Sequence, residues 1–404
     1  MTDIPSAAFA SGIAAAYEPG LLQAFDDMKR LRRDIHRHPE LGYEETRTSA
    51  LVAERLRGWG YEVRQGLGRT GVVGTLRVGR GGRAIGLRAD MDALPIDEAS
   101  GCAHASSRPG VMHACGHDGH TATLLAAARE LARTRDFSGT LHLIFQPAEE
   151  GGAGALAMLE DGLLDVAPCE AVYALHNYPT PTLRFGQMSI GIGPVMASVD
   201  SLRIVVTGRG GHAASPQFVA DPIVAAGGII AALQTIVSRN TNPFDSAAVS
   251  LTSIHAGTNY NVIPGELEMK LSVRALDEAQ RRMILDRVGD IVQGQAASFG
   301  VRARVETAGH SYPVLVNAEA PALAARDTAA RLFGPDMVVA GHPPILAADD
   351  FAFIAQRVPS CYINMGAGAG PNLHNAGYDF NDELILAAGS FWVRLVRDQL
   401  RPGA

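Results

Sequence analysis

The stretch from residue 195 to residue 308 most constrains the fold, because its expected elements can close a small domain by themselves. Apolar periodicity predicts the order strand, helix, strand, strand, helix, strand, which is a ferredoxin-like split unit. The six expected elements are residues 202–207, 222–238, 247–255, 266–275, 278–297 and 301–307. A self-contained unit in the middle of a chain implies that the parts on either side of it belong together.

Strands and helices alternate on both sides of this stretch. The expected helices are 21–38, 44–59, 121–133, 153–160, 318–333, 350–356 and 382–400, and the expected strands are 72–78, 84–88, 140–145, 171–175 and 361–365. Such alternation produces right-handed crossovers and a sheet that helices cover on both faces. We therefore expect an α/β main domain made of residues 1–194 and 309–404, with residues 195–308 inserted as a second domain.

Length and composition exclude several classes of protein. At 404 residues, two or three domains are expected, and 47 % hydrophobic against 19 % charged residues is typical of a soluble globular protein. The net charge of −7 and the lack of a basic run disfavour nucleic acid as a partner. The longest uncharged stretch, 222–238, is too short and too rich in glycine for a membrane span. Four scattered cysteines and no basic segment near residue 1 indicate a reducing cytoplasm.

The densest group of chemically active residues is the run 112–120, just ahead of an expected helix. Cys115 and His117 flank a glycine, so both side chains can turn toward one cation, and thiolate and imidazole suit zinc and other first-row metals. Taken alone, the run fits a helix-capping loop with hydrogen-bonded histidines equally well.

Two adjacent carboxylates, Glu149 and Glu150, follow the expected strand 140–145. In an extended chain they point to opposite sides, so one can bind a metal while the other faces the substrate. A carboxylate beside a metal-activated water can take its proton, which is what hydrolysis requires. Taken alone, the pair more often represents a solvated start of the next helix.

His176 ends the expected strand 171–175, and His374 lies in a glycine-rich loop after the expected strand 361–365. A single histidine at a strand end is more often structural than functional. Here, however, several such groups fall at strand ends or in the loops after them, where the ligands of α/β sheets gather. Their repetition therefore favours a shared site.

The ordered motifs resemble the metal-dependent amidohydrolases that include hippurate hydrolase and the indole-acetyl-amino-acid hydrolases, a branch of the aminoacylase and carboxypeptidase G group (peptidase M20 family). The resemblance covers nearly the whole chain, from about residue 27 to residue 400. The motifs that carry it are 88–95, 113–120, 146–151, 175–177, 210–216 and 373–375. The resemblance implies a zinc-exopeptidase-like catalytic domain with a mixed sheet, and a ferredoxin-like domain that serves as a dimerisation surface or lid.

The resemblance also implies roles for individual residues. Two divalent metals would be held by Cys115, His117, Glu150, His176 and His374. Glu149 matches the general base, and Asp92 matches a carboxylate that orients the metal ligands. Asp90 stands where wider relatives have a metal-binding histidine, so it is not expected to be a ligand. His212 matches a histidine that polarises the scissile carbonyl, often in the active site of a partner subunit.

The expected reaction is hydrolysis of a hippurate-like N-acyl amino acid, whose acyl group is aromatic or acetyl. Zinc or manganese is the expected metal, with cobalt or nickel as alternatives. The residues expected to hold the substrate carboxylate are Asn261, Arg274, Gly366 and Gly368. Dipeptide or exopeptide cleavage by the same site is the leading alternative. A Cys115 nucleophile leaves Glu150, His176 and His374 without a role, and a metal-bound scaffold or sensor leaves Glu149 without one. A homodimer or higher homo-oligomer is expected.

Overall fold

The structure, a computed structural model, describes residues 12–401 and divides the chain into two compact units. The larger unit is Met1–Gly193, Val316–Pro343 and Asp350–Ala404, and the smaller unit is Pro194–Leu315 and Pro344–Asp349. The expected inserted segment, 195–308, falls within the smaller unit. The expected ranges 1–194 and 309–404 also include residues 1–11 and 402–404, which lie outside the described part of the chain.

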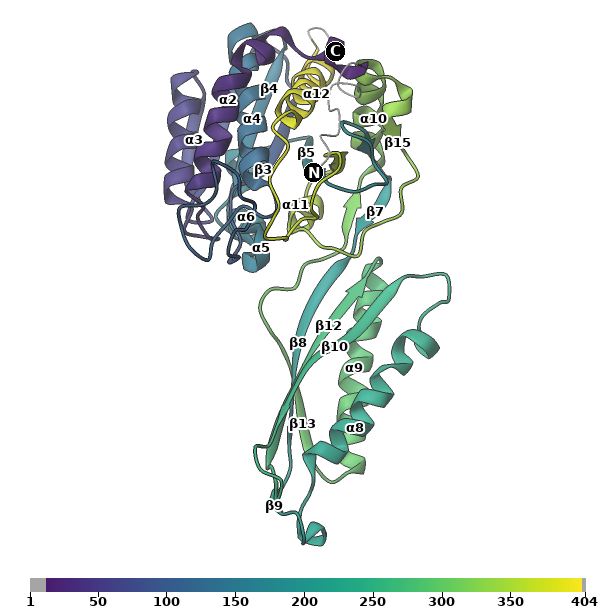
Figure 1. Ribbon diagram of the computed structural model, residues 1–404. Helices are drawn as coiled ribbons and strands as arrows, with labels where there is room; N and C mark the ends of the chain where they lie inside the picture. Colours follow the sequence, from purple (N-terminus) through teal and green to yellow (C-terminus); the bar gives the residue numbers. More distant parts are fainter. Residues whose placement is uncertain (1–11, 402–404) are drawn as a thin grey trace. The chain divides into compact units, whose positions relative to one another are not determined.

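A mixed sheet of eight strands forms the centre of the larger unit, in the order β1-β2-β4-β3-β5-β16-β6-β15 (Figure 1). The strands are β1 (Glu62–Leu67), β2 (Gly71–Val78), β3 (Ala84–Asp90), β4 (Gly139–Gln146), β5 (Ala171–Tyr178), β6 (Met188–Ser189), β15 (Val338–Val339) and β16 (Ser360–Gly366). The four central strands β4, β3, β5 and β16 run parallel, while β1 and β2 pair antiparallel at one edge. The carboxyl ends of β4, β3, β5 and β16 therefore meet at one edge of the unit.

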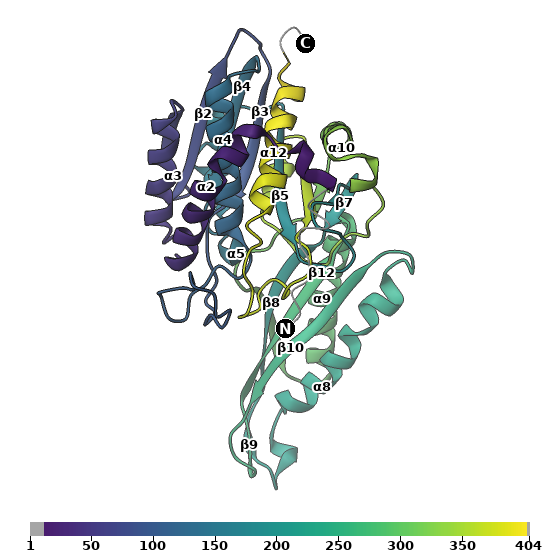
Figure 2. The same cartoon turned by 45° about the horizontal axis from the view of Figure 1, so that its top comes forward.

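Helices cover both faces of this sheet, as expected. One face carries α2 (Pro19–Arg37), α3 (Thr46–Gly58), α4 (His117–Thr134), α10 (Glu319–Phe333) and α12 (Leu384–Gln399); Figures 1 and 2 show α2, α3 and α4 side by side. The other carries α6 (Gly154–Glu160), α7 (Leu163–Val166) and α11 (Phe351–Ala355). Successive side chains of β16 point to opposite faces of the sheet. Ile363 packs in the main hydrophobic core, which includes residues of α4 and α12, whereas Tyr362 packs on Phe351 of α11.

The smaller unit has the expected ferredoxin-like order. Its elements are β8 (Ser198–Thr207), α8 (Pro222–Leu233), β10 (Ala247–Ala256), β12 (Glu266–Ala275), α9 (Glu278–Ser298) and β13 (Arg302–Thr307). The strands form an antiparallel sheet in the order β10-β12-β8-β13, and both helices lie on one face of it (Figure 1). A separate ribbon joins β9 (Gly211–His212) to β11 (Val262–Ile263). Short strands β7 (Gly193–Met196) and β14 (Leu315–Asn317) complete the list.

The expected helix 222–238 is divided in the structure. The helix α8 ends at Leu233, and a π-helical turn follows at Ile236–Asn240. By length and composition alone the stretch Pro222–Asn240 could cross a membrane, which is weak evidence for a span. Within the unit, Ala225, Ile229 and Leu233 of α8 are buried in the core above the sheet, so this face of the helix has a place in a folded domain.

Candidate metal centre and active site

The structure brings together all the metal ligands expected from the sequence. Their candidate ligand atoms form three groups, each with mutual separations within 4.8 Å: Cys115, His117 and His176; Cys115, Glu150 and His374; and His117, Glu149 and Glu150. Cys115 and His117 each belong to two groups, so the six side chains form one connected cluster. His374 is exposed and Glu150 partly so, whereas the others are buried, so the cluster opens to solvent on the side of His374.

The start of α4 places both ligands: His117 is its first residue, and Cys115 lies in the loop just before it. The expected start of this helix at residue 121 is wrong, because α4 begins at His117. Gly116 precedes it with a φ of 90°, a left-handed conformation that lets the chain enter the helix at once. A Cβ atom at Gly116 would lie 2.7 Å from the side-chain oxygen of Asn177, so no larger residue fits between the two ligands.

Hydrogen bonds aim the histidine rings at the cluster. His117 Nδ1 lies 3.1 Å from a carboxylate oxygen of Asp92, and among the described residues its buried Nε2 has no hydrogen-bond partner. His176 Nδ1 donates to the carbonyl oxygen of Asn177 at 2.7 Å, which leaves its Nε2 facing Cys115 Sγ at 3.4 Å. His176 therefore presents the lone pair of Nε2, while Asp92 keeps a proton on His117 Nδ1, so that a cation can replace the proton on His117 Nε2.

The two glutamates lie in a tight turn, Glu149–Gly152, and not in the extended chain that the sequence suggested. Ala148, with a φ of 50°, bends the chain directly after β4. The amide of Glu150 donates to Asp92 at 2.9 Å, and Glu150 Oε1 lies 3.1 Å from His374 Nε2. Glu149 is buried, and the turn directs both carboxylates into the cluster.

The electrostatics of the cluster favour a bound cation. Burial, together with the nearby carboxylates of Glu150 and Glu149, raises the pKa of the Cys115 thiol well above its usual value. Burial lowers the pKa of His117, but Asp90 and Asp92 outweigh it and raise this pKa to about 10. A buried thiol among carboxylates ionises only when a positive charge enters, and a divalent cation supplies that charge with matching donors.

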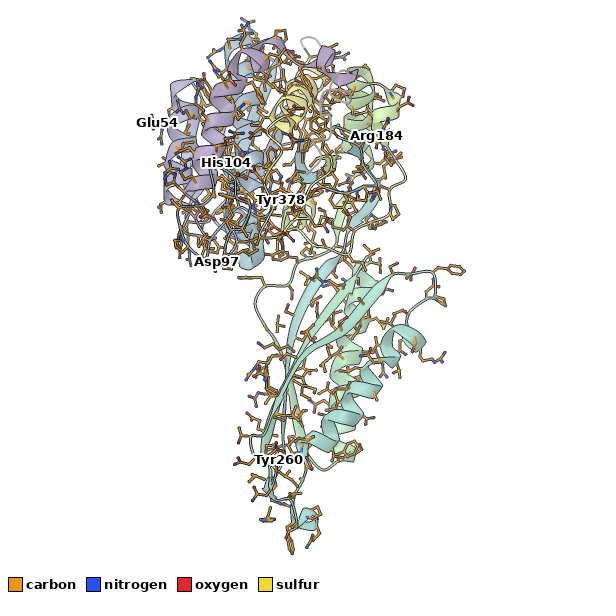
Figure 3. The ribbon with its side chains drawn as sticks, viewed as in Figure 1. Glu54, Asp97, His104, Arg184, Tyr260 and Tyr378 are labelled. Carbon is orange, nitrogen blue, oxygen red and sulfur yellow. The ribbon has the colours of Figure 1, made fainter. Side chains whose placement is uncertain are left out.

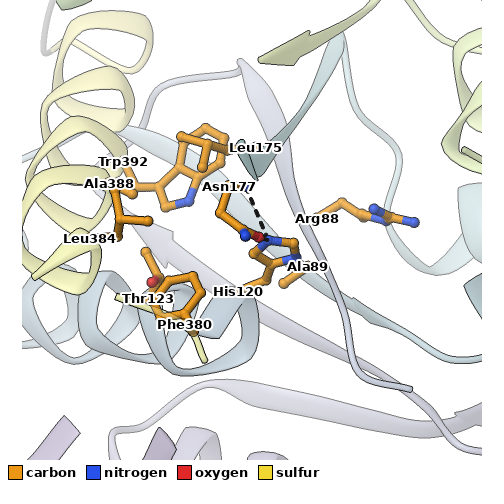
Figure 4. A pocket seen from close by; sticks show the side chains of 10 residues that line it. All are labelled: Arg88, Ala89, His120, Thr123, Leu175, Asn177, Phe380, Leu384, Ala388 and Trp392. Atoms are coloured by element: carbon orange, nitrogen blue, oxygen red, sulfur yellow. Dashed lines mark hydrogen bonds between the residues drawn. The ribbon is translucent and has the colours of Figure 1, made fainter. Parts of the chain in front are cut away.

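A hydrogen-bonded chain behind the cluster was missed by the sequence argument. His120 contacts Asp90 through Nδ1 and Asn177 through Nε2, both at 2.5 Å, as Figure 4 shows for Asn177. Arg88 donates to Asp90 at 2.6 Å, and Asn177 donates to the Tyr378 hydroxyl at 2.6 Å. His117 and His120 are three residues apart at the start of a helix, so they lie on the same side of it. This spacing could have predicted that His120 lies beside the cluster.

A second group of side chains, His36, Cys102 and Asp379, also has ligand atoms close enough to hold a metal. It is part of a network of charged side chains and not a second metal site. The buried guanidinium of Arg32 donates to Asp379 at 2.7 Å and to Asp118 at 3.3 Å, so a permanent positive charge already occupies this region. His36 also contacts Asp118 at 2.8 Å. Burial lowers the pKa of His36, but the Asp118 carboxylate outweighs this effect and raises the pKa to about 10. The network fixes the first turn of α4 through Asp118.

In the glycine-rich loop that β16 leads into, the amide of Gly366 does not have the substrate-binding role expected from the sequence. The amide of Gly366 donates to the carbonyl oxygen of Gln187 at 2.8 Å, so it is not available for a substrate carboxylate. Gly368, with a φ of 82°, lies farther along the loop and borders a cavity of about 540 Å³. The cavity is also lined by the apolar residues Pro179, Pro181, Leu183, Phe185, Ala367 and Ala369, by Gly370, and by the polar or charged residues Thr180, Arg184, Asn372, Asn381 and Glu383.

His212 and Asn261 lie together at one end of the smaller unit. The carbonyl oxygen of Asn261 accepts from the amide of Ala213 at 3.0 Å, and Tyr260 marks this end in Figure 3. His212 is exposed, and its Nδ1 accepts from the amide of Ala214 at 3.0 Å. The proton of the neutral ring therefore lies on Nε2, which makes Nε2–H an outward hydrogen-bond donor.

Arg274 lies at the opposite end of the same unit. In β12, Glu266 pairs with Thr207 and Arg274 pairs with Val199, so eight residues separate the two ends. At about 3.3 Å per residue this is roughly 26 Å, and the His212 ribbon lies beyond the Thr207 end. Arg274 donates to the carbonyl oxygen of Leu346 at 3.4 Å, at the end where the chain enters the unit.

Known proteins are similar to this chain over most of its length. Hippurate hydrolase from Campylobacter jejuni is 41 % identical over 95 % of this chain and 99 % of its own length. N-acetyl-L-cysteine deacetylase from Bacillus subtilis is 39 % identical over 89 % of this chain and 85 % of its own. A crystal structure from B. subtilis, described as a dinuclear metal binding peptidase from the M20 family, matches with a TM-score of 0.80 and 34 % identity, covering 94 % of this chain and 99 % of that one. The family model "Peptidase family M20/M25/M40" matches residues 86–398, and the chain belongs to this family, which confirms the resemblance seen in its motifs.

Proposed function

We propose that this chain is a metal-dependent amidohydrolase that cleaves N-acyl amino acids to a carboxylic acid and an amino acid. The observation that carries the proposal is Glu149, whose carboxylate lies within 4.8 Å of His117 and Glu150. The cluster offers five other donor side chains for metal, so Glu149 adds a carboxylate that can move a proton. The hydrolases among the relatives, which act on hippurate and N-acetyl-L-cysteine by their names, support the substrate class.

We further propose that the cluster holds two divalent cations; the structural relative from B. subtilis is described as a dinuclear metal binding peptidase, which supports a pair of metals. Thiolate, imidazole and carboxylate together suit zinc, and manganese, cobalt and nickel also match this donor set. The proposed ligands are Cys115, His117, Glu150, His176 and His374. When bound, such cations supply Lewis-acid activation of water and of the amide carbonyl.

The residues of the chain would divide the remaining work. Glu149 takes the proton of the attacking water and later gives it to the leaving nitrogen. Asp92 keeps the proton of His117 on Nδ1 and holds the amide of Glu150, so it fixes both sides of the cluster. His212 donates from Nε2 to the oxygen that becomes negative as the carbonyl is attacked.

The aromatic or acetyl acyl group would enter the cavity of about 540 Å³ beside the glycine-rich loop. This cavity lies between the segments that follow β5 and β16, the strands whose ends supply His176 and the loop of His374. Its apolar side chains, including Leu183 and Phe185, suit a flat aromatic ring such as benzoyl. We therefore favour hippurate-like substrates over dipeptides.

The substrate carboxylate would be held by Arg274, Asn261 and the loop amide of Gly368. Because Asn261 and His212 lie at the far end of the unit from Arg274, we propose that one substrate meets them from two copies of the chain. A homodimer is therefore the proposed form of the enzyme. Arg274 would come from one protomer, and His212 with Asn261 from its partner.

Two features of the smaller unit support a dimer. Ile223 and Val224 of α8 are exposed apolar side chains, and β10 is an edge strand of the four-stranded sheet. An uncovered edge strand with an apolar helix beside it is suited to pairing with a second copy. We also propose a cytoplasmic location, which the four free cysteines support.

The proposal is tested by hydrolysis of a substrate panel. We expect the purified protein, loaded separately with zinc, manganese, cobalt or nickel, to cleave N-benzoyl, N-acetyl or N-indoleacetyl amino acids faster than dipeptides of matched size. Dipeptide cleavage at higher kcat/KM would establish the exopeptidase alternative instead. Failure to cleave any amide with every metal, while metal binds, would favour a sensor or scaffold.

Cys115 is expected to be a metal ligand and not a nucleophile. We therefore expect Cys115→Asp, which keeps a negatively charged ligand, to retain measurable activity when loaded with manganese. Mass spectrometry of the wild type during turnover should show no acyl group on Cys115. An acyl-thioester trapped at this residue, with Cys115→Asp inactive in every metal, would reverse the assignment.

A further inference from the structure

We propose that Glu45 is a positioning residue for Glu149, which it orients by holding the backbone amide of Ala148. This inference rests on the proposed function, because it assigns a means of placing the general base. Glu45 lies directly before α3, about a hundred residues earlier in the chain than the turn it contacts. It is not part of the metal-ligand cluster.

The turn that carries Glu149 has an unusual backbone. Ala148 and Ala153, on either side of it, have φ values of 50° and 55°, in the left-handed region that residues with a Cβ atom rarely occupy. Within the turn, Glu150 and Gly151 also depart from helical angles. A turn of this kind keeps its shape only when its surroundings hold it.

Three side chains hold the backbone of this turn at three successive points. Glu45 accepts from the amide of Ala148 at 2.8 Å, Asp92 accepts from the amide of Glu150 at 2.9 Å, and the Tyr43 hydroxyl donates to the carbonyl oxygen of Gly152 at 2.7 Å. Asp92 also contacts His117, so its bond is shared with the metal ligands. The hydrogen bonds from Glu45 and Tyr43 hold the turn without contacting a proposed metal ligand other than through its backbone.

Close packing supports these bonds. A Cβ atom at Gly42 would lie 3.0 Å from Ala148 Cβ, and one at Gly152 would lie 2.7 Å from the same atom. The segment that carries Tyr43 and Glu45 therefore approaches the turn as closely as glycine allows. The turn has little room to move toward α3 while this segment is in place.

The Glu45 carboxylate is buried between the turn and Thr70. It is fully buried, and its second carboxyl oxygen accepts from the Thr70 hydroxyl at 2.6 Å. Burial raises its pKa to about 7, against the hydrogen bonds from Thr70 and Ala148 that lower it. An apolar side chain of similar size would avoid this cost but could not accept from Ala148.

Loss of the Glu45 acceptor would leave the amide of Ala148 buried without a partner, which is unfavourable. The peptide between Pro147 and Ala148, which carries this amide, could then rotate, Ala148 could relax toward an ordinary φ, and the Glu149 carboxylate would move with it. A misplacement of about 1 Å in a reacting group can cost about 10²-fold in rate. Because the amide of Glu150 is held separately by Asp92, the metal ligands would be affected less.

The test compares Glu45→Ala, Glu45→Gln and the control Glu44→Ala. Glu44 is the adjacent exposed glutamate, and it pairs with Arg108 at the surface. We expect Glu45→Ala to lower kcat by roughly 10- to 100-fold with KM and metal content unchanged. Glu45→Gln, whose amide oxygen can accept from Ala148, should recover most of this loss, and Glu44→Ala should behave as the wild type.

A readout independent of turnover is hydrogen exchange of the peptide covering residues 146–153, measured with and without metal. Exchange there should be at least tenfold faster in Glu45→Ala than in the wild type, and near the wild-type rate in Glu45→Gln. If Glu45→Ala does not fold, Glu45→Leu, which fills the same volume without an acceptor, replaces it.

Three outcomes would overturn the inference: kcat of the variant within twofold of the wild type, unchanged exchange at residues 146–153, or loss of metal in parallel with activity. An inactive wild type in the substrate panel would instead refute the proposed function. The exchange measurement would still decide whether Glu45 holds the turn.

Discussion

Replacing Glu149 by Gln is expected to lower kcat by about 10²- to 10⁴-fold while the metal content stays at the wild-type level. The amide of glutamine has almost the same shape as the carboxylate, so the turn and its hydrogen bonds should persist. It cannot accept a proton from water, however, and therefore cannot pass one to the leaving nitrogen. Glu149 is only 7 % exposed, so bulk water cannot easily take over this function.

The matched comparison for this variant is Glu150→Gln, one residue along the chain. Glu150 contacts His374 and belongs to the same group as Cys115, so this change should reduce metal content as well as rate. Steady-state kinetics and metal analysis of both variants separate the two roles. A Glu149→Gln enzyme that turns over at nearly the wild-type rate would show that another group is the base.

Replacing His212 by Ala is expected to lower kcat by about 10²- to 10³-fold, the usual effect of removing one donor to an oxyanion. The acceptor role of Nδ1 toward Ala214 leaves Nε2–H as the donor, and the exposed ring is unobstructed for this purpose. His310→Ala, another exposed histidine in the same unit, is the control and should have the wild-type rate.

Mixing two inactive variants tests whether His212 acts in the partner's site. Hybrid dimers of Glu149→Gln and His212→Ala would contain one site with both residues intact, so the mixture should regain part of the wild-type activity. Subunit exchange is verified first with tagged chains. If fully exchanged mixtures stay inactive, His212 acts in the site of its own protomer. If His212→Ala alone is as active as the wild type, His212 has no catalytic role.

Much of the fold could be predicted because its strands and helices have clear apolar periods. The central strands β3, β4, β5 and β16 are rich in buried apolar residues, and the smaller unit follows its expected order. The edge strand β1 was missed, since five of its six residues are partly or fully exposed and show no alternation. The two-residue strands β6 and β15 are too short to have any period, and the spatial order of strands is not written in their sequence order.

The proposed metal cluster could be predicted because parallel strands bring their carboxyl ends to one edge. Glu150 and the loop of His374 follow two such strands, and His176 lies near the carboxyl end of a third, β5, which runs on to Tyr178. Glu45 could not, since it follows no strand and its partner is a backbone amide, which leaves no trace in residue type. The role expected for the Gly366 amide failed for a similar reason. Its bond to Gln187 depends on how two loops pack, and glycine content alone does not specify that.

The position of β16 between β5 and β6 has a consequence for biosynthesis. Strand β5 ends at Tyr178, but its neighbour begins only at Ser360, roughly 180 residues later, or about 10 to 40 s of translation. During that time one side of β5 has no strand partner, and its backbone amides and carbonyls are open to wrong pairing. The last of the proposed metal ligands, His374, is made later still. The complete set of proposed ligands can therefore form only after this loop has been made, so full metal binding would have to follow the synthesis of both β16 and His374.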